Sequence, residues 1–144
     1  MPPRPIVLDD RLLIHELLVG LPTRGAPLHT TTYWYYRACR AAVLGAGGHL
    51  SGPFQGLPDA DQRLAVLAML ALPDHITLPE SRALVPAMVD VAGRHPRLNL
   101  LNLEVAAYAG LVDATVWLSP EAAAGVLPDV LDADGVRWRT VEIE

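Results

Sequence analysis

The 144-residue sequence contains one cysteine, no lysine and few charged residues of either sign. Cys39 has no second cysteine with which to form an intramolecular disulfide, and there is no cysteine cluster for structural zinc. We therefore expect a reducing, cytoplasmic location. All 11 basic residues are arginines and the formal net charge is −5, so the chain lacks the overall positive field of many nucleic-acid-binding proteins. Any contact with nucleic acid must be local.

Long hydrophobic runs are also absent. No run approaches 18 uninterrupted apolar residues, and the opening residues 1–5 lead into a short strand pattern rather than the apolar stretch of a signal peptide. We expect no membrane association. Apolar residues make up 51% of the chain and charged residues 19%. This composition predicts a single domain over residues 1–144 and an apolar surface that a partner covers, most simply in a homodimer.

Helical and strand patterns alternate along the chain. Clusters of glycine and proline at 45–58 predict a loop, and a helix after it carries Leu64 and Leu67 on one face. Strands are predicted at 6–8, 75–78, 115–118 and 136–143, and helices at 9–20, 30–44, 59–72, 81–93 and 99–112, with another from 119. Short strands separated by helices predict a three-layer α/β/α fold with a mainly parallel central sheet of four to five strands.

Acidic side chains follow two of these strands. Asp9 comes directly after the apolar residues 6–8, and Glu121 follows the strand 115–118 in the turn Ser-Pro-Glu. Because α/β sheets usually bind ligands at the carboxyl ends of their strands, these positions indicate a ligand site. Each acid also has a structural explanation, since Asp9 is a preferred helix N-cap and Glu121 a normal first-turn acid.

The order of these features resembles the PIN-like domain family, which includes many toxin ribonucleases of toxin/antitoxin operons. The resemblance rests on Asp9 after Ile-Val-Leu, the helix LNLLNLEVAAYA, the strand and turn TVWLSPE, and the closing GVRWRTVEI. It implies the three-layer fold, an RNA target, and an antitoxin-like protein partner. It also implies acidic residues that hold Mg²⁺ or Mn²⁺, because hard cations prefer oxygen ligands and then activate water for phosphodiester cleavage.

Only two of the four family acids have a carboxylate in this sequence. Asp9 matches the first and Glu121 the fourth, while the third falls on Asn102 and the second within Tyr33–Tyr36, which has no carboxylate. The catalytic set implied by the resemblance is therefore Asp9, Asn102 and Glu121, with Asp9 and Glu121 as metal ligands. Two carboxylates neutralise a pair of divalent ions poorly, so we expect weak Mg²⁺ or Mn²⁺ binding.

Two hypotheses of function follow. In the first, a PIN-like protein with an incomplete metal site acts by binding RNA or a protein partner, with little or no catalysis. In the second, an active ribonuclease holds one Mg²⁺ through Asp9, Glu121 and a further acid, Asp10 or Glu104, while Asn102 positions water. The sequence predicts that Glu104 is exposed.

Other polar residues allow more than one interpretation. Arg11 either pairs with a cleft carboxylate or is solvated, and the sequence alone favours solvation. The segment Tyr33–Tyr36, with Arg37 and Arg40, could stack on bases and hold a phosphate, but it fits better as core on one face and interface on the other. Cys39 has no histidine at a spacing that indicates a catalytic pair, which predicts a half-buried helix thiol.

Overall fold

The structure, a computed structural model, describes residues 2–44 and 59–143. Helices and strands alternate along most of the chain. In chain order they are β1 (Ile6–Leu8), α1 (Asp10–Leu18), β2 (Leu28–Thr30), α2 (Thr32–Leu44), α4 (Asp59–Leu70), β3 (Ile76–Thr77), α5 (Ser81–Arg94), α6 (Leu100–Val112), β4 (Thr115–Leu118), α7 (Pro120–Ala123), α8 (Leu127–Ala133) and β5 (Trp138–Thr140). The predicted loop at 45–58 lies outside the described residues.

Within the described residues, five strands form one sheet in the order β3-β2-β1-β4-β5, and every neighbouring pair is parallel. The prediction of a mainly parallel sheet of four to five strands is confirmed. Strand β1 lies at the centre, where Leu8 is level with Thr30 on one side and Trp117 on the other. The loops after β1, β2 and β4 therefore meet at one edge of the sheet, which we call the carboxyl edge.

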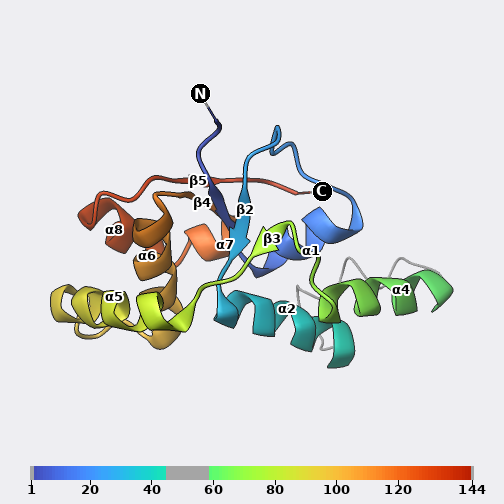
Figure 1. The fold of residues 1–144 in the computed structure, drawn as a ribbon, viewed down its shortest axis with the longest axis horizontal. Helices are drawn as coiled ribbons and strands as arrows, with labels where there is room; N and C mark the ends of the chain where they lie inside the picture. The colour runs from blue at the N-terminus through green and yellow to red at the C-terminus, as the bar shows by residue number, and fades with distance from the viewer. Residues whose placement is uncertain (1, 45–58, 144) are drawn as a thin grey trace.

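Helices cover both faces of the sheet (Figure 1), with α1, α2 and α4 on one side and α5, α6 and α8 on the other. The alternating side chains of the strands separate two hydrophobic clusters. Ile6 and Leu8 of β1 belong to the cluster with α1, α2 and α4, whereas Val7 belongs to the cluster with α5, α6 and α8. This period of two is the expected behaviour of a strand buried on both faces. The predicted three-layer α/β/α architecture is confirmed.

Some local predictions are wrong. The sequence assigned Thr30 to the start of a helix, but Thr30 ends β2, and Thr31 caps α2 by accepting a hydrogen bond at Oγ1 from the Trp34 backbone N–H at 3.2 Å. Threonine suits both roles because its β-branched side chain favours strands and its hydroxyl favours caps. A strand of only three residues gives a periodicity too short to separate the two.

Helix α4 also packs differently from the expected face. Leu64 and Leu67 are exposed, while Ala65 and Met69 are buried against the sheet and its neighbouring helices. Residues 64–70 are all apolar, so helical periodicity could not show which face of this part of the helix packs inward. Tyr35 of α2 fixes the observed packing, because its hydroxyl donates to the Met69 carbonyl oxygen at 2.9 Å near the end of α4.

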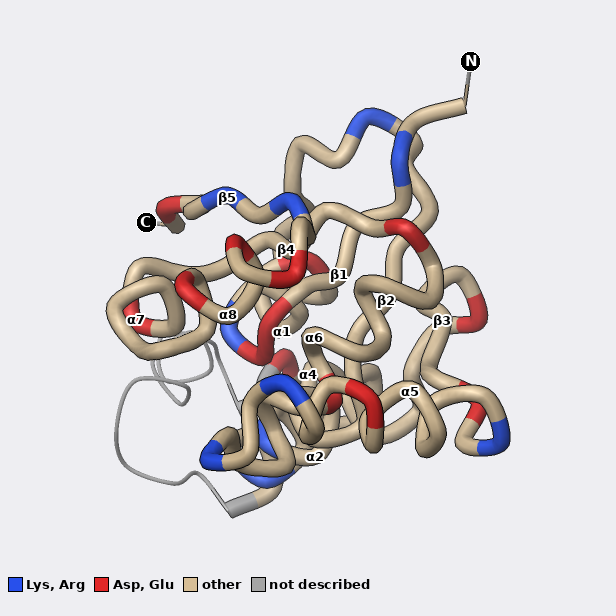
Figure 2. The backbone as a smooth tube through the Cα atoms, turned by 90° about the vertical axis from the view of Figure 1, so that its left-hand side faces the viewer, with Lys and Arg blue, Asp and Glu red and all other residues tan. Residues whose placement is uncertain are grey.

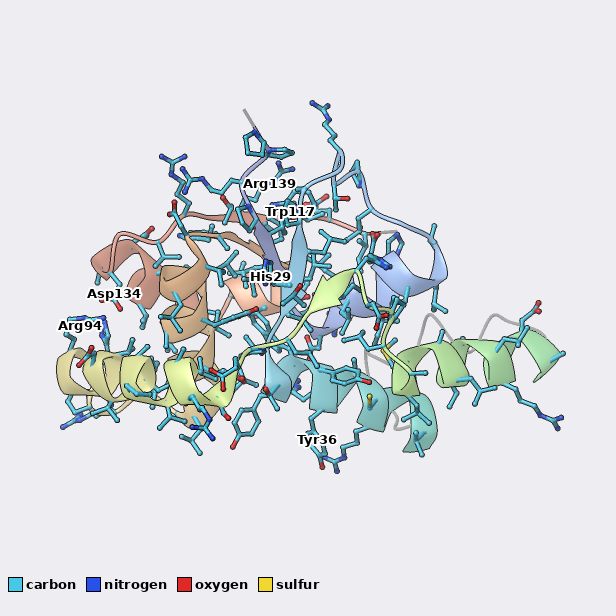
Figure 3. The ribbon with its side chains drawn as sticks, in the orientation of Figure 1. His29, Tyr36, Arg94, Trp117, Asp134 and Arg139 are labelled. Atoms are coloured by element: carbon cyan, nitrogen blue, oxygen red, sulfur yellow. The ribbon has the colours of Figure 1, made fainter. Side chains whose placement is uncertain are left out.

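On the other face of the sheet, polar side chains connect the end of α5 to the end of α8 (Figure 3). Arg94 at the end of α5 contacts Asp134, which follows α8, with Nη2 and Oδ2 3.2 Å apart. His95 Nε2 lies 2.9 Å from Asp134 Oδ1. Burial alone would raise the pKa of Asp134, but the hydrogen bonds from Arg94 and His95 outweigh it and lower the pKa. Among residues 2–44 and 59–143, no helix is long and apolar enough to span a membrane.

Candidate functional site

Asp9 joins the ends of the two central strands at the carboxyl edge. Its Oδ2 accepts hydrogen bonds from the Ser119 backbone N–H at 2.7 Å and from the Ser119 hydroxyl at 2.6 Å. Its Oδ1 accepts from the Leu12 backbone N–H at 2.8 Å, which makes Asp9 the N-cap of α1. The side chain has no exposed surface. The capping role considered from the sequence is therefore present, and the structure adds a connection to β4.

Burial and hydrogen bonding act on the Asp9 carboxyl in opposite directions. The net effect raises its pKa from 3.8 to about 6: burial is the largest cause, hydrogen bonds from Ser119 and Leu12 partly offset it, and the neighbouring charge of Asp10 adds to the rise. The carboxyl is thus mainly ionised at neutral pH, with both oxygen atoms already accepting hydrogen bonds. An incoming cation would have to share or displace these donors.

Asp10 is buried beside Asp9 and faces an arginine of α2. Its Oδ1 accepts a hydrogen bond from the Arg11 backbone N–H at 3.0 Å, and Arg37 Nε lies 2.9 Å from Oδ2. The Arg37 contact is an ion pair without hydrogen-bond alignment, and Oδ2 accepts no hydrogen bond within the part of the chain that the structure describes. Burial raises the pKa of Asp10 despite the nearby positive charge of Arg37.

Arg11 faces the second candidate metal ligand. Its Nη1 atom lies 3.5 Å from Glu121 Oε1, with only 17% of the Arg11 side chain exposed against 51% for Glu121. The prediction that Arg11 is solvated is wrong. Position 11 is on the first turn of α1 and position 121 is on the first turn of α7, so the pair connects the segments that follow β1 and β4. A guanidinium therefore lies at the carboxylate that the resemblance assigns to a metal ion.

Glu104 is not the exposed residue that the sequence predicts. It is 2% exposed, and its two carboxylate oxygen atoms accept hydrogen bonds from the backbone N–H groups of Thr32 and Tyr33, each at 2.9 Å. These groups lie at the start of α2, where helical N–H groups lack partners within the helix. The first turn of α2 has no acidic residue of its own, which was the available signal that an acceptor comes from elsewhere. Glu104 thus caps α2.

Asn102 takes no part in the hydrogen bonds and ion pairs described above for Asp9 and Glu121. It is in the first turn of α6, with a partly exposed side chain and a backbone N–H that donates to Asn99 Oδ1 at 3.0 Å. Within the described residues, no hydrogen bond connects its side chain to Asp9 or Glu121. The structure places Asp9 and Glu121 at the same edge, and the segments bearing them are joined through Ser119 and Arg11.

These carboxyls do not fit the metal centre that the resemblance implies. Over residues 2–44 and 59–143, no group of three or more His, Cys, Asp or Glu side chains is arranged to hold a metal ion. The tube view (Figure 2) shows positions of both signs of charge around the start of α1 rather than an uninterrupted acidic patch. The site instead combines carboxylates with arginines of the same chain, an arrangement that neutralises negative charge without a divalent ion.

Comparison with known proteins shows the fold. No family model matches the sequence. No curated protein matches it either. Among solved structures, the chain is similar to one in the 2.2 Å structure of VapBC-1 from nontypeable Haemophilus influenzae, with a TM-score of 0.54 and 12% sequence identity. The similarity covers 94% of this chain and 97% of the other, and it supports the PIN-like fold predicted from the order of elements.

Proposed function

We propose that this protein is a PIN-like protein of toxin-ribonuclease ancestry that binds RNA and hydrolyses it poorly or not at all. The similarity to a VapBC-1 chain and the family resemblance of the sequence support the ancestry. In this proposal, positive charge at the carboxyl edge comes from Arg11 and Arg37, and divalent ions contribute little. The resemblance also suggests an antitoxin-like protein as a second partner.

The main support for this proposal is that each candidate metal-binding carboxylate already contacts a hydrogen-bond donor or an arginine of the same chain. Asp9 accepts three hydrogen bonds from Ser119 and Leu12, while Glu121 faces Arg11 and Asp10 faces Arg37. A second metal ligand would require Glu121 to leave Arg11. Mg²⁺ sheds its water reluctantly and depends on several oxygen ligands, so such a site favours the guanidinium over the ion.

The active ribonuclease is the competing function, and one observation favours it. Asp9, Asp10 and Glu121 all lie on the segments that follow β1 and β4, at the edge where parallel sheets place catalytic groups. Glu104 is less suited to this function than the sequence suggested, since both its oxygen atoms already cap α2. The enzyme would need Arg11 to release Glu121 when metal binds.

The two functions are separated by incubating the purified protein with labelled single-stranded RNA in either Mn²⁺ or EDTA. We expect a shifted RNA–protein complex under both conditions and intact RNA after deproteinisation. Asp9→Asn is the matched variant, because it removes a candidate ligand while keeping the side chain's size. Mn²⁺-dependent cleavage that Asp9→Asn abolishes would establish the enzyme instead, and absence of any complex would remove the RNA-binding function.

A further inference from the structure

We propose that the exposed face of α2, formed by Tyr33, Tyr36, Arg37 and Arg40, binds single-stranded RNA by base stacking and phosphate contacts. The proposal rests on the RNA-binding function above and assigns it a surface. These residues are spaced as i, i+3, i+4 and i+7, so they share one side of the helix. The opposite side, with Trp34 and Ala38, is buried in the two hydrophobic clusters.

The side chains of two tyrosines on this face are exposed. Tyr33 is 39% exposed and Tyr36 is 59% exposed. Tyr36 projects from α2 away from the sheet (Figure 3). By contrast, Tyr35 donates to the end of α4 and the Tyr108 hydroxyl lies 2.7 Å from His29 Nδ1. In the described part of the chain, the hydroxyls of Tyr33 and Tyr36 form no such bond, and their rings remain available for stacking.

The positive charge of the α2 arginines is complementary to the negative charge of the RNA phosphates. The helix contains two arginines and no acidic residue, although the chain as a whole has a net charge of −5. Arg37 is held at Nε by Asp10 while 53% of its side chain remains exposed. A guanidinium offers five N–H donors, so the Asp10 contact orients Arg37 and leaves donors for a phosphate. Arg40 is also exposed, one turn further along the helix.

The chemistry of this face suits RNA. The exposed side of α4 carries the aliphatic side chains of Leu64, Leu67 and Leu70, which suit a protein contact. The α2 face has aromatic rings beside arginines, the combination that holds single-stranded nucleic acid through stacking and backbone charge. Arg37 also makes the face continuous with the carboxyl edge, because it contacts Asp10 beside Asp9. RNA bound on α2 would therefore extend towards the candidate site.

The test measures binding of a fluorescein-labelled single-stranded RNA of about 12 nucleotides, in EDTA, by fluorescence anisotropy. We expect Tyr33→Ala/Tyr36→Ala to raise Kd at least about tenfold, because stacking of each base carries substantial binding energy. Tyr33→Phe/Tyr36→Phe should keep most of the affinity, since the ring remains. Arg40→Gln should weaken binding and reduce the dependence of log Kd on log salt concentration. The same sequence in a duplex should bind more weakly.

The control substitutions are made at exposed residues of α5. Val85→Ala/Val89→Ala is the control for Tyr33→Ala/Tyr36→Ala, and Arg82→Gln is the control for Arg40→Gln. These variants should bind RNA like the wild type, and thermal unfolding should confirm that all variants fold. Unchanged RNA affinity in the Tyr33→Ala/Tyr36→Ala variant would overturn the α2 surface while leaving RNA binding intact. A wild type that binds no RNA would overturn both. Light scattering tests whether the wild type forms an oligomer. If it does, and if the Tyr33→Ala/Tyr36→Ala variant is a monomer, this face binds a second copy of the chain instead of RNA.

Discussion

Ser119 controls how the buried Asp9 carboxylate is held. Its hydroxyl and backbone N–H both donate to Asp9 Oδ2, and the hydroxyl bond is a main factor that lowers the pKa of Asp9 against burial. The hydroxyl does not cap α7, although Ser119 occupies that helix's N-cap position. The Ser119 hydroxyl thus supports the acid that follows β1 rather than the start of its own helix.

Ser119→Ala should therefore raise the pKa of Asp9 further above its value of about 6. The variant removes one donor to the ionised carboxyl and leaves the backbone donors in place, so stability at neutral pH should fall by about 1–2 kcal/mol. The carboxyl ¹³C chemical shift of Asp9 across a pH titration reports the pKa, and urea unfolding reports the stability. Ser81→Ala, on the exposed start of α5, is the control. An unchanged Asp9 titration would contradict the hydrogen-bond geometry.

The raised pKa of Asp9 also predicts how stability depends on pH. Between pH 3.8 and about 6 the folded state binds more protons at Asp9 than the unfolded state does, so Asp9 lowers stability as pH rises through this window. A shift from 3.8 to about 6 corresponds to a loss on the order of 3 kcal/mol, complete above pH 6. Asp10, whose pKa is also raised, acts in the same direction.

The measurement is the free energy of unfolding of the wild type and Asp9→Asn at several pH values from 4 to 7. The wild type should lose stability relative to the variant as pH rises, because the amide does not titrate. Two parallel pH profiles would show that Asp9 titrates alike in the folded and unfolded states and would contradict its raised pKa.

At the scale of elements, Glu104 positions the start of α2. Its carboxylate satisfies the N–H groups of Thr32 and Tyr33 from a different helix, 72 and 71 residues away in sequence. This contact couples α6 to the helix that carries the proposed RNA surface. It also explains why a charged residue is tolerated at 2% exposure, since both oxygen atoms accept hydrogen bonds.

Glu104→Ala should destabilise the protein by about 1–3 kcal/mol, because two N–H groups at the start of α2 lose their acceptor. Hydrogen exchange should increase at Thr32 and Tyr33 more than elsewhere in the helix. Glu80→Ala is the matched control, since Glu80 caps α5 in the same way but is exposed, and it should cost about 1 kcal/mol or less. Equal losses in the two variants would show that burial adds nothing to the Glu104 cap.

The sequence predicts an element well where its pattern is local. The apolar residues of β1 and β4 end at polar turns, so Asp9 and Glu121 could be assigned to strand ends before their contacts were known. The predicted helix start at 99 is also local, since Asn99 Oδ1 accepts from the Asn102 N–H at the start of α6. Strand β2 was missed because its three residues merge with a threonine-rich helix start.

The candidate site is less predictable because its partners are distant in sequence. Whether Arg11 pairs with Glu121 depends on β1 and β4 being neighbours, and whether Arg37 reaches Asp10 depends on how α2 packs against α1. Neither contact has a sequence signature. The buried state of Glu104 was missed because its partners belong to another helix, and the absence of an acidic residue from the first turn of α2 does not say which residue supplies the acceptor.

At the scale of the whole molecule, a PIN-like fold brings carboxylates and arginines of the same chain together at its carboxyl edge. Five parallel strands and two helical layers bring the segments after β1 and β4 together as the resemblance implies. The residues at these segments then pair with arginines of the same chain. Self-association, predicted from the apolar composition, stays a prediction, and light scattering at micromolar protein concentration tests it.

We propose that arginines, and not divalent ions, offset the negative charge of the carboxylates at this edge. The most direct test is the thermal stability of the wild type in Mn²⁺ or EDTA, beside a variant that combines Arg11→Gln, Arg37→Gln and Asn102→Asp. A ligand present at or below its Kd stabilises the folded state by no more than about 0.4 kcal/mol, so millimolar Mn²⁺ should barely change the melting temperature of the wild type. The variant should gain clear Mn²⁺-dependent stabilisation, because it frees two carboxylates and adds a third. Strong stabilisation of the wild type by Mn²⁺, lost on Asp9→Asn, would show instead that this edge binds a divalent ion through Asp9.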